Sequence, residues 1–246
     1  MSSINGIEDP MTVGGTAGSR RGGASRLEND KLLYLVRHGT TEMNECIANA
    51  RLQGVKNFVD PMLYDTKLSE RGLMQAENLA KITAALHGNT SSSNNASADA
   101  IELIVLSPLG RAMKTAELGF KHVEAARVIC PLARERVFYS SDVGRSPSVL
   151  SQEFPYLDFT ELDEIWWHTD GSGDPMAVVP EPDDVFAERI ARLREWLLNR
   201  PEKVIAVVSH WAVLQALTRR CFQNCELFTC YLSETFPIAT QKKKDK

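Results

Sequence analysis

Short, continuous runs of apolar residues alternate along the chain with longer segments in which apolar residues recur every three or four positions. The continuous runs cover residues 32–36, 101–106 and 204–208, and a weaker run covers residues 127–130. Runs of this length without alternating polar residues are typical of strands buried on both faces, as in a parallel sheet covered by helices. They predict the strands of a mostly parallel central sheet.

Segments with helical periodicity follow these runs. We predict helices that begin near Ser69, at Pro108, at Pro182 and after Ser209, since serine is a good N-cap and proline suits the first turn of a helix. Their apolar stripes are Leu73, Ala76, Ala80 and Thr83, then Ala112, Thr115 and Leu118, then Phe186, Ile190, Leu193 and Leu197, and finally Val213, Leu214 and Leu217. Strands that alternate with helices in this way favour an α/β fold, a three-layer αβα sandwich with right-handed crossovers.

Irregular, polar segments interrupt this pattern and predict the domain organisation. Residues 1–30 are rich in glycine and serine and lack an apolar face, so we expect a disordered leader. A single domain is expected over residues 31–230. Within it we expect a low-complexity loop at 88–100 and a cap or insertion at 140–181. Residues 231–246 are expected to form a flexible basic tail.

Composition fits one soluble domain. The chain has 246 residues, of which 43% are hydrophobic and 24% are charged, with a net charge of −4. The charge is uneven, because residues 153–188 hold 11 Asp and Glu but no Lys or Arg, which leaves +7 on the rest of the chain. We interpret this acidic stretch as a solvated surface insertion.

The composition gives no support for a nucleic-acid or membrane partner, because bulk charge is acidic and no run approaches the ~20 apolar residues that cross a bilayer. The five cysteines are an odd number without zinc-site spacing, and no apolar segment of a secretory signal is visible. We therefore expect a cytoplasmic protein.

Two arginines and two histidines occur where predicted strands end. Arg37 and His38 follow the first run, Arg111 lies just after the second, and His210 follows the last. In a parallel sheet these ends meet at one edge, where ligands bind and where helix N-termini favour anions. A lone histidine after a strand is more commonly structural, but four such groups together predict a phosphate site, because cations buried there without an anion would be costly.

Other chemistries fit these residues less well. A zinc site formed by His38 and His210 would place Arg37 and Arg111 beside a dication, which is electrostatically unfavourable. The chain also lacks the Gly-x-Ser-x-Gly elbow of serine hydrolases, the phosphate loop of NTPases and the Gly-x-Gly-x-x-Gly dinucleotide motif. We predict neither a metal nor another cofactor.

Four ordered motifs resemble those of the histidine phosphatase superfamily, which includes the cofactor-dependent phosphoglycerate mutases. Residues 37–44 resemble its Arg-His-Gly-x-Thr-x-x-Asn signature, and residues 68–76 resemble its Leu-Thr-x-x-Gly-x-x-Gln-Ala helix start. Residues 107–116 resemble its Ser-x-x-x-Arg-Ala-x-x-Thr-Ala segment, and residues 208–210 resemble its second histidine motif. The resemblance spans residues 31–217 and implies a phosphoglycerate mutase-like fold.

The resemblance also implies a role for each matching residue. His38 would be the nucleophile that forms a phosphohistidine, consistent with an imidazole pKa of ~6.5 that leaves the ring neutral at physiological pH. Arg37, Arg111 and His210 would bind the non-bridging oxygens of the phosphate. Further hydrogen bonds to the phosphate would come from Asn44 and Thr41.

The proton donor to the leaving oxygen is less well defined. The family places a glutamate in a Leu-x-Glu context after the third strand, and here Glu135 occupies that place with Ala133 where leucine is usual. Asp142 is the alternative donor. Glu135 could instead be an ion-pair partner of Arg134 or Arg136.

Departures from the family pattern favour a phosphatase over a mutase. Trp211 and Ala212 stand where many relatives have small glycines, and the Glu-Arg-His-Tyr-Gly run of mutases is absent. We therefore expect a metal-independent phosphatase that acts on a small phosphorylated substrate as a monomer or homodimer. A phosphoglycerate mutase-type transferase is the alternative, and a silent phosphate-binding module is a more distant one.

Overall fold

The computed structural model describes residues 30–88 and 100–236. Of the predicted irregular segments, residues 1–29, 89–99 and 237–246 lie outside the described residues. The predicted boundary at residue 230 is wrong, because a strand continues to Tyr231 and a 3₁₀ helix covers Leu232–Glu234. Leu232 is buried and its backbone N–H donates to Lys31 O, so the ordered domain reaches residue 236.

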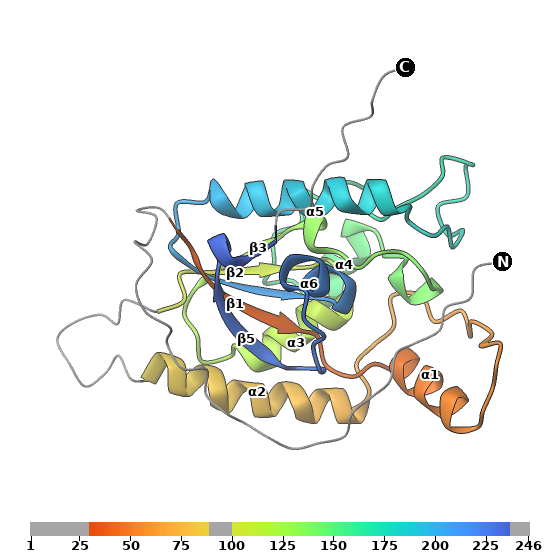
Figure 1. Cartoon of the computed structure of the whole chain (residues 1–246), viewed down its shortest axis with the longest axis horizontal. Helices are drawn as coiled ribbons and strands as arrows, with labels where there is room; N and C mark the ends of the chain where they lie inside the picture. The colour runs from red at the N-terminus through yellow and green to blue at the C-terminus, as the bar shows by residue number, and fades with distance from the viewer. Residues whose placement is uncertain (1–29, 89–99, 237–246) are drawn as a thin grey trace.

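In the described part of the chain, five strands form one sheet in the order β3-β2-β4-β1-β5 (Figure 1). Their bounds are β1 Leu32–Arg37, β2 Leu103–Leu106, β3 Ala126–Ile129, β4 Val204–Ser209 and β5 Leu227–Tyr231. All neighbours are parallel except β1 and β5. The four strands predicted from apolar runs are therefore confirmed, and the sheet is mostly parallel.

Helices cover both faces of the sheet. The helices are α1 Glu42–Leu52, α2 Glu70–Gly88, α3 Gly110–Gly119, α4 Pro147–Glu153, α5 Asp183–Leu198 and α6 Trp211–Thr218. α2 and α3 lie on one side of the sheet, and α5 and α6 lie on the other (Figure 1). This arrangement confirms the αβα sandwich.

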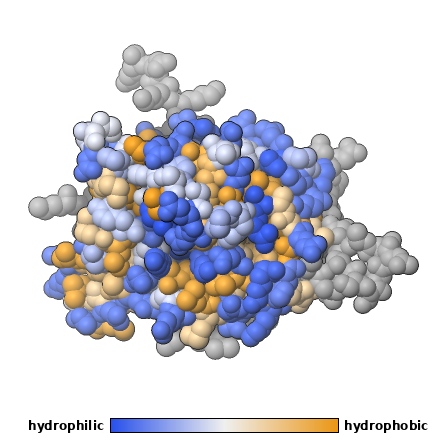
Figure 2. Space-filling model, turned by 180° about the vertical axis from the view of Figure 1, so that it is seen from behind, coloured by the Kyte–Doolittle hydropathy of each residue, from blue (hydrophilic) through white to orange (hydrophobic). Residues whose placement is uncertain are grey.

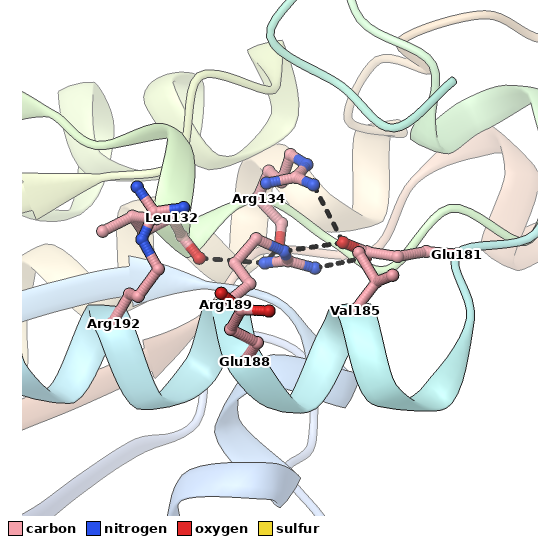
Figure 3. Close-up of a pocket in the computed structure, with 7 residues that line it drawn as sticks. All are labelled: Leu132, Arg134, Glu181, Val185, Glu188, Arg189 and Arg192. Atoms are coloured by element: carbon pink, nitrogen blue, oxygen red, sulfur yellow. Dashed lines mark hydrogen bonds and ion pairs between the residues drawn. The ribbon is translucent and has the colours of Figure 1, made fainter. Parts of the chain in front are cut away.

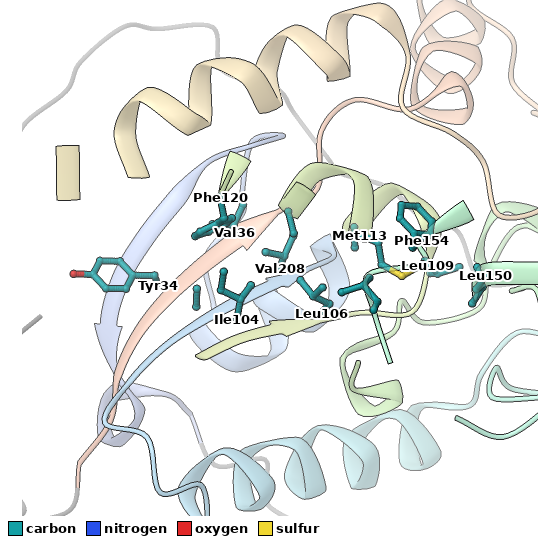
Figure 4. Close-up of a cluster of buried hydrophobic side chains, with 14 of the residues drawn as sticks. Tyr34, Val36, Ile104, Leu106, Leu109, Met113, Phe120, Leu150, Phe154 and Val208 are labelled. Atoms are coloured by element: carbon teal, nitrogen blue, oxygen red, sulfur yellow. The ribbon is translucent and has the colours of Figure 1, made fainter. Parts of the chain in front are cut away.

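Two apolar clusters fill the spaces between the layers. On β1, Leu33 and Leu35 belong to the cluster shared with α5 and α6. Tyr34 and Val36 belong to the cluster shared with α2 and α3, part of which is drawn in Figure 4. Successive side chains of a strand point to opposite faces, so an uninterrupted apolar run is what a strand between two helical layers requires.

Some details of the predicted helices need correction. α3 begins at Gly110 with Leu109 as its N-cap, two residues after the Pro108 start that we predicted. On α2, Leu73 is 37% exposed, while Leu79, which we did not include in the stripe, is 1% exposed. The helices starting near residues 69, 182 and 209 are confirmed.

The interpretation of the acidic stretch as a solvated insertion is only partly right. Several of its apolar side chains, among them Phe154, Trp166 and Trp167, are buried in the cluster on the α2 and α3 side. Glu181, at the end of the same stretch, is fully buried. The acidic side chains are therefore mostly at the surface of a segment that completes the core.

Hydrophobic residues also gather at one corner of the surface. Figure 2, the face opposite to that of Figure 1, shows them over α1 and the loop that follows it, at the lower left. The exposed fractions there are 86% for Leu52, 82% for Val59 and 52% for Met62. This corner lies at the end of α1, whose first turn belongs to the first histidine motif.

Candidate active site

Three parallel strands deliver their last residues to one edge of the sheet. β1 ends at Arg37, and the N–H of His38 donates to Ser209 O at the end of β4 at 3.0 Å. His210 is the N-cap of α6, and Arg111 lies in the first turn of α3. The rings of His38 and His210 have centroids 5.0 Å apart. The two histidines and the arginines predicted from the strand ends therefore lie together.

The hydrogen bond of His38 assigns its tautomer. The residue is 4% exposed, and its Nδ1 lies 2.7 Å from Gly39 O. A carbonyl only accepts, so Nδ1 carries the proton and Nε2 keeps its lone pair. Burial, followed by the charges of Arg111 and Arg37, lowers the pKa of His38 well below its usual value. The lowered pKa keeps the ring neutral at physiological pH, with a lone pair on Nε2.

Two buried polar atoms at this edge lack partners among the described residues. They are Nε of Arg37 and Nδ1 of His210. The other contacts of these side chains are defined: Arg37 Nη1 donates to Phe222 O at 2.7 Å, and His210 Nε2 lies 2.6 Å from Ser107 Oγ. Burial, then the charge of Arg111, lowers the pKa of His210 well below its usual value. Buried polar atoms without a partner are rare in folded proteins and are expected where a ligand supplies the missing contacts.

Arg111 is held by the segment that includes Asp142. Its Nη1 donates to Ser141 O, and its Nη2 forms an ion pair with Asp142 Oδ1 at 2.9 Å. The second oxygen of Asp142 accepts from the N–H groups of Phe138 and Tyr139 at 3.1 and 3.0 Å. Burial raises the pKa of Asp142, and the charge of Arg111 opposes this rise. Asp142 is thus positioned to orient Arg111, and its oxygens are already occupied.

Glu135 lies beside the first turn of α6. Its Oε1 accepts from Arg136 N at 2.8 Å, and its Oε2 accepts from Ala212 N at 3.3 Å, two residues after His210. Burial of the carboxyl group, then the nearby charge of Asp142, raises the pKa of Glu135 to about 7. Ion pairing of Glu135 with its neighbours is not what the structure shows, because Arg134 pairs with Glu181 and Arg136 with an aspartate on α5.

Thr41 and Asn44 form the first turn of α1. Thr41 Oγ1 accepts from Asn44 N at 3.1 Å, and Asn44 Oδ1 accepts from Thr41 N at 3.2 Å, which is a capping box. Thr41 is 1% exposed, and its side chain caps the N-terminus of α1. Asn44 is half-buried and lies at this helix start, beside the loop that carries His38.

Some supporting residues escaped the sequence analysis. Ser107 contacts His210, and Ser209 Oγ donates to Ala133 O at 2.7 Å. Both follow apolar runs, so their position at the strand ends was a usable signal. Thr115 Oγ1 accepts from Gly39 N at 3.0 Å, and Asn224 Nδ2 donates to His38 O at 2.9 Å. Asn224 lies in an irregular loop and carries no signal in the sequence.

The comparison with known families decides the identity of this site. The model of the histidine phosphatase superfamily (branch 1) matches residues 33–227. The chain belongs to this superfamily. The match begins in β1 and ends at the first residue of β5, so it includes all the strand ends described above.

Similar members of the histidine phosphatase superfamily carry both phosphatase and mutase-like names. A Schizosaccharomyces pombe protein named "Probable phosphatase" is 29% identical over 194 residues, which are 74% of each chain. Phosphoglycerate mutase-like protein 1 of Arabidopsis thaliana is 27% identical over 252 residues, covering 82% of this chain and 80% of that protein. The structure of an alpha-ribazole phosphatase from Shigella flexneri is 26% identical with a TM-score of 0.41, covering 76% of this chain and 77% of its own.

Two further observations concern the described residues of this superfamily member. Within residues 30–88 and 100–236, no group of three or more His, Cys, Asp or Glu is arranged to hold a metal ion. In the same part of the chain, no helix is both long and apolar enough to cross a bilayer.

Proposed function

We propose that the protein is a metal-independent phosphatase that hydrolyses a small phosphomonoester through a phosphohistidine intermediate. The observation that carries this proposal is the neutral His38, whose Nδ1 donates to Gly39 O and whose Nε2 is left as a nucleophile among cations. The unpartnered Nε of Arg37 supplies a donor for a phosphate oxygen, and the unpartnered Nδ1 of His210 leaves a second polar atom free to contact the phosphate.

In the first step, the phosphate lies among Arg37, Arg111 and His210, and Nε2 of His38 attacks phosphorus. The N–P bond forms as the P–O bond to the leaving group breaks. The leaving oxygen takes the proton of Glu135, whose raised pKa keeps part of the carboxyl protonated near neutral pH. The arginines stabilise the charge on the equatorial oxygens, which is the main electrostatic task in phosphoryl transfer.

In the second step, water hydrolyses the phosphohistidine. The Glu135 carboxylate accepts a proton from the attacking water, the N–P bond breaks, and inorganic phosphate leaves. His38 returns to its neutral form and Glu135 is protonated again. The cycle consumes one water and needs no external acid, reductant or oxidant.

A mutase-type reaction is the second candidate, since the Arabidopsis relative is named mutase-like. A mutase keeps the phosphoryl group on His38 and returns it to another hydroxyl of the substrate. The absence of the Glu-Arg-His-Tyr-Gly run of mutases favours the phosphatase. Incubation with 3-phosphoglycerate and its bisphosphate separates the two reactions, since a phosphatase releases inorganic phosphate and a mutase yields the 2-isomer.

Removal of metal ions tests whether hydrolysis relies on arginine side chains rather than on a bound metal. We expect the rate of hydrolysis of 4-nitrophenyl phosphate to be unchanged by EDTA, because Arg37 and Arg111 neutralise the charge that a metal would otherwise neutralise. The measurement is the initial rate with and without EDTA, with release of inorganic phosphate as a second readout. A rate lost in EDTA and restored by added Mg²⁺ or Zn²⁺ would contradict the proposal.

The pH dependence tests the role of Glu135. As a general acid it must be protonated, so kcat/KM falls as pH rises through its pKa, about 7. His38 must be neutral, and because its pKa is lowered, loss of activity from its protonation is confined to pH well below 6.5. Glu135→Gln should lower kcat/KM for ethyl phosphate by about 10²–10⁴-fold and remove the decline near pH 7.

Glu188→Gln, the same change at an exposed position of α5, serves as the control for this profile. It should leave both the rate and the decline near pH 7 as in the wild type. If Glu135→Gln keeps the wild-type profile, the proton comes from another group.

A further inference from the structure

The segment that carries Glu135 has little regular structure of its own. A 3₁₀ helix ends at Ala133, and residues 134–139 belong to no helix or strand. Backbone hydrogen bonds within an element therefore do not place the Glu135 carboxyl group. Its position beside the first turn of α6, where Ala212 N donates to Oε2, must come from contacts with the rest of the protein.

Glu181 contacts both chain neighbours of Glu135. Its Oε1 accepts from Arg134 Nη2 at 2.8 Å, and its backbone carbonyl accepts from Arg136 Nε at 2.8 Å. Its backbone N–H also donates to Val137 O at 3.0 Å. Three residues that flank the proposed acid, Arg134 before it and Arg136 and Val137 after it, are thus joined to one glutamate 46 positions further along the sequence.

Arg189 on α5 belongs to the same network (Figure 3). Its Nε and Nη2 bind the two oxygens of Glu181 at 2.9 and 2.5 Å. Its Nη1 donates to Leu132 O and Arg134 O at 2.9 and 2.8 Å. The bidentate ion pair therefore holds the backbone before Glu135 as well, since a planar guanidinium has donors on several sides.

The network is buried and ionised. Glu181 is fully buried, and Arg189 is 4% exposed. Burial by itself would raise the pKa of Glu181, but the hydrogen bond and charge of Arg189 outweigh it and lower the pKa. A buried pair with this geometry adds little net stability over apolar packing, but breaking it is costly, so its value lies in specifying one arrangement.

We propose that Glu181 is a positioning residue for proton transfer, holding the 132–137 segment so that the Glu135 carboxyl group reaches the oxygen that leaves phosphorus. This inference rests on the proposed function, in which Glu135 is the proton donor. It also gives the acidic stretch a role in the reaction, through its one fully buried carboxylate.

The consequence is a dependence on the leaving group. An alkoxide leaves only with a proton, whereas 4-nitrophenolate leaves readily without one. A displaced acid therefore slows hydrolysis of ethyl phosphate and leaves 4-nitrophenyl phosphate nearly unaffected. A displacement of about 1 Å is enough to cost about 10²-fold in rate. Loss of folded protein, by contrast, lowers both rates by the same factor.

The test compares these two substrates in the full chain. Glu181→Gln keeps the shape of the side chain and removes the charge that binds Arg134 and Arg189. We expect kcat/KM for ethyl phosphate to fall about 10²-fold and that for 4-nitrophenyl phosphate to change by less than about threefold. Glu188→Gln is the matched control, because Glu188 is the exposed neighbour of Arg189 on α5 (Figure 3). It should behave as the wild type on both substrates.

Arg189→Lys is a second test of the proposal, and it can be used if Glu181→Gln does not fold. Lysine keeps the buried charge pair but cannot bind both oxygens of Glu181 and two carbonyls at once. The same selective loss on ethyl phosphate is expected.

Equal loss on both substrates in folded protein, or no loss on either, overturns the proposal. If Glu135→Gln itself is not selective, the assignment of the acid is wrong. If the wild type hydrolyses neither substrate, the proposed phosphatase activity is wrong.

Discussion

Replacing His38 by alanine should abolish phosphatase activity. Its Nε2 is the nucleophile, and its orientation depends on the hydrogen bond from Nδ1 to Gly39 O. Without the imidazole of His38, water would have to attack a bound phosphomonoester directly. In enzymes with a covalent intermediate, loss of the nucleophile costs about 10⁴-fold or more in rate. We expect a fall of this size in kcat/KM for 4-nitrophenyl phosphate.

The intermediate itself gives a second readout. Rapid quenching of the wild type with ³²P-labelled substrate should yield an acid-labile, alkali-stable phosphoenzyme, and His38→Ala should yield none. His122→Ala is the matched control, because His122 is exposed and lies away from the strand ends. Equal rates for wild type and His38→Ala would sink the phosphohistidine mechanism. A phosphoenzyme in the alanine variant would move the nucleophile to another residue.

Replacing Arg111 by methionine should have the next largest effect. Arg111 is 3% exposed, and its charge lowers the pKa of both His38 and His210, so it lies at the centre of the cationic site. One arginine that stabilises a transferred phosphoryl group contributes about 10³–10⁵-fold in rate. We expect a loss in this range in kcat/KM, whereas Arg51→Met on the exposed surface of α1 should have no effect.

The same substitution should destabilise the fold. It leaves the Asp142 carboxylate buried without its cation, and breaking a buried ion pair from one side costs about 3–5 kcal/mol. Urea unfolding measures this loss, and kinetics below the unfolding transition separate it from the catalytic one. Arg111→Lys should recover part of the stability but little of the rate, because lysine cannot bind Ser141 O, Asp142 and phosphate together. Full activity in Arg111→Met would remove this residue from the phosphate site.

The sheet was predictable where the pattern was strong. β1 and β4 are uninterrupted apolar runs because helices cover both of their faces. β5 was missed because it is an antiparallel edge strand with only Cys230 buried, so its sequence shows neither a continuous run nor a clear alternation. α1 was missed for a related reason, since Met43 is its one buried residue and no apolar stripe marks the helix.

The residues of the site likewise divide into those that the sequence could predict and those that it could not. The cations at the strand ends could be found because parallel strands that end together bring His38 and His210 to one edge whatever the intervening loops do. The choice between Glu135 and Asp142 could not be made from the sequence, because neither lies in a periodic apolar pattern: Glu135 is in a segment without regular structure and Asp142 ends a short 3₁₀ helix. Their different environments come from contacts with Ala212 and Arg111, which lie far away along the chain.

Periodicity and strand-end chemistry are local properties, and they suffice to specify the layered α/β architecture and the phosphate-binding edge. The orientation of Arg111 by Asp142, the raised pKa of Glu135 and the hold of Glu181 on residues 134–137 depend on pairs separated by 31 to 77 positions. Such pairs form only when helices and loops pack, because an ion pair or a desolvated carboxyl group needs burial by residues that the local sequence does not contain.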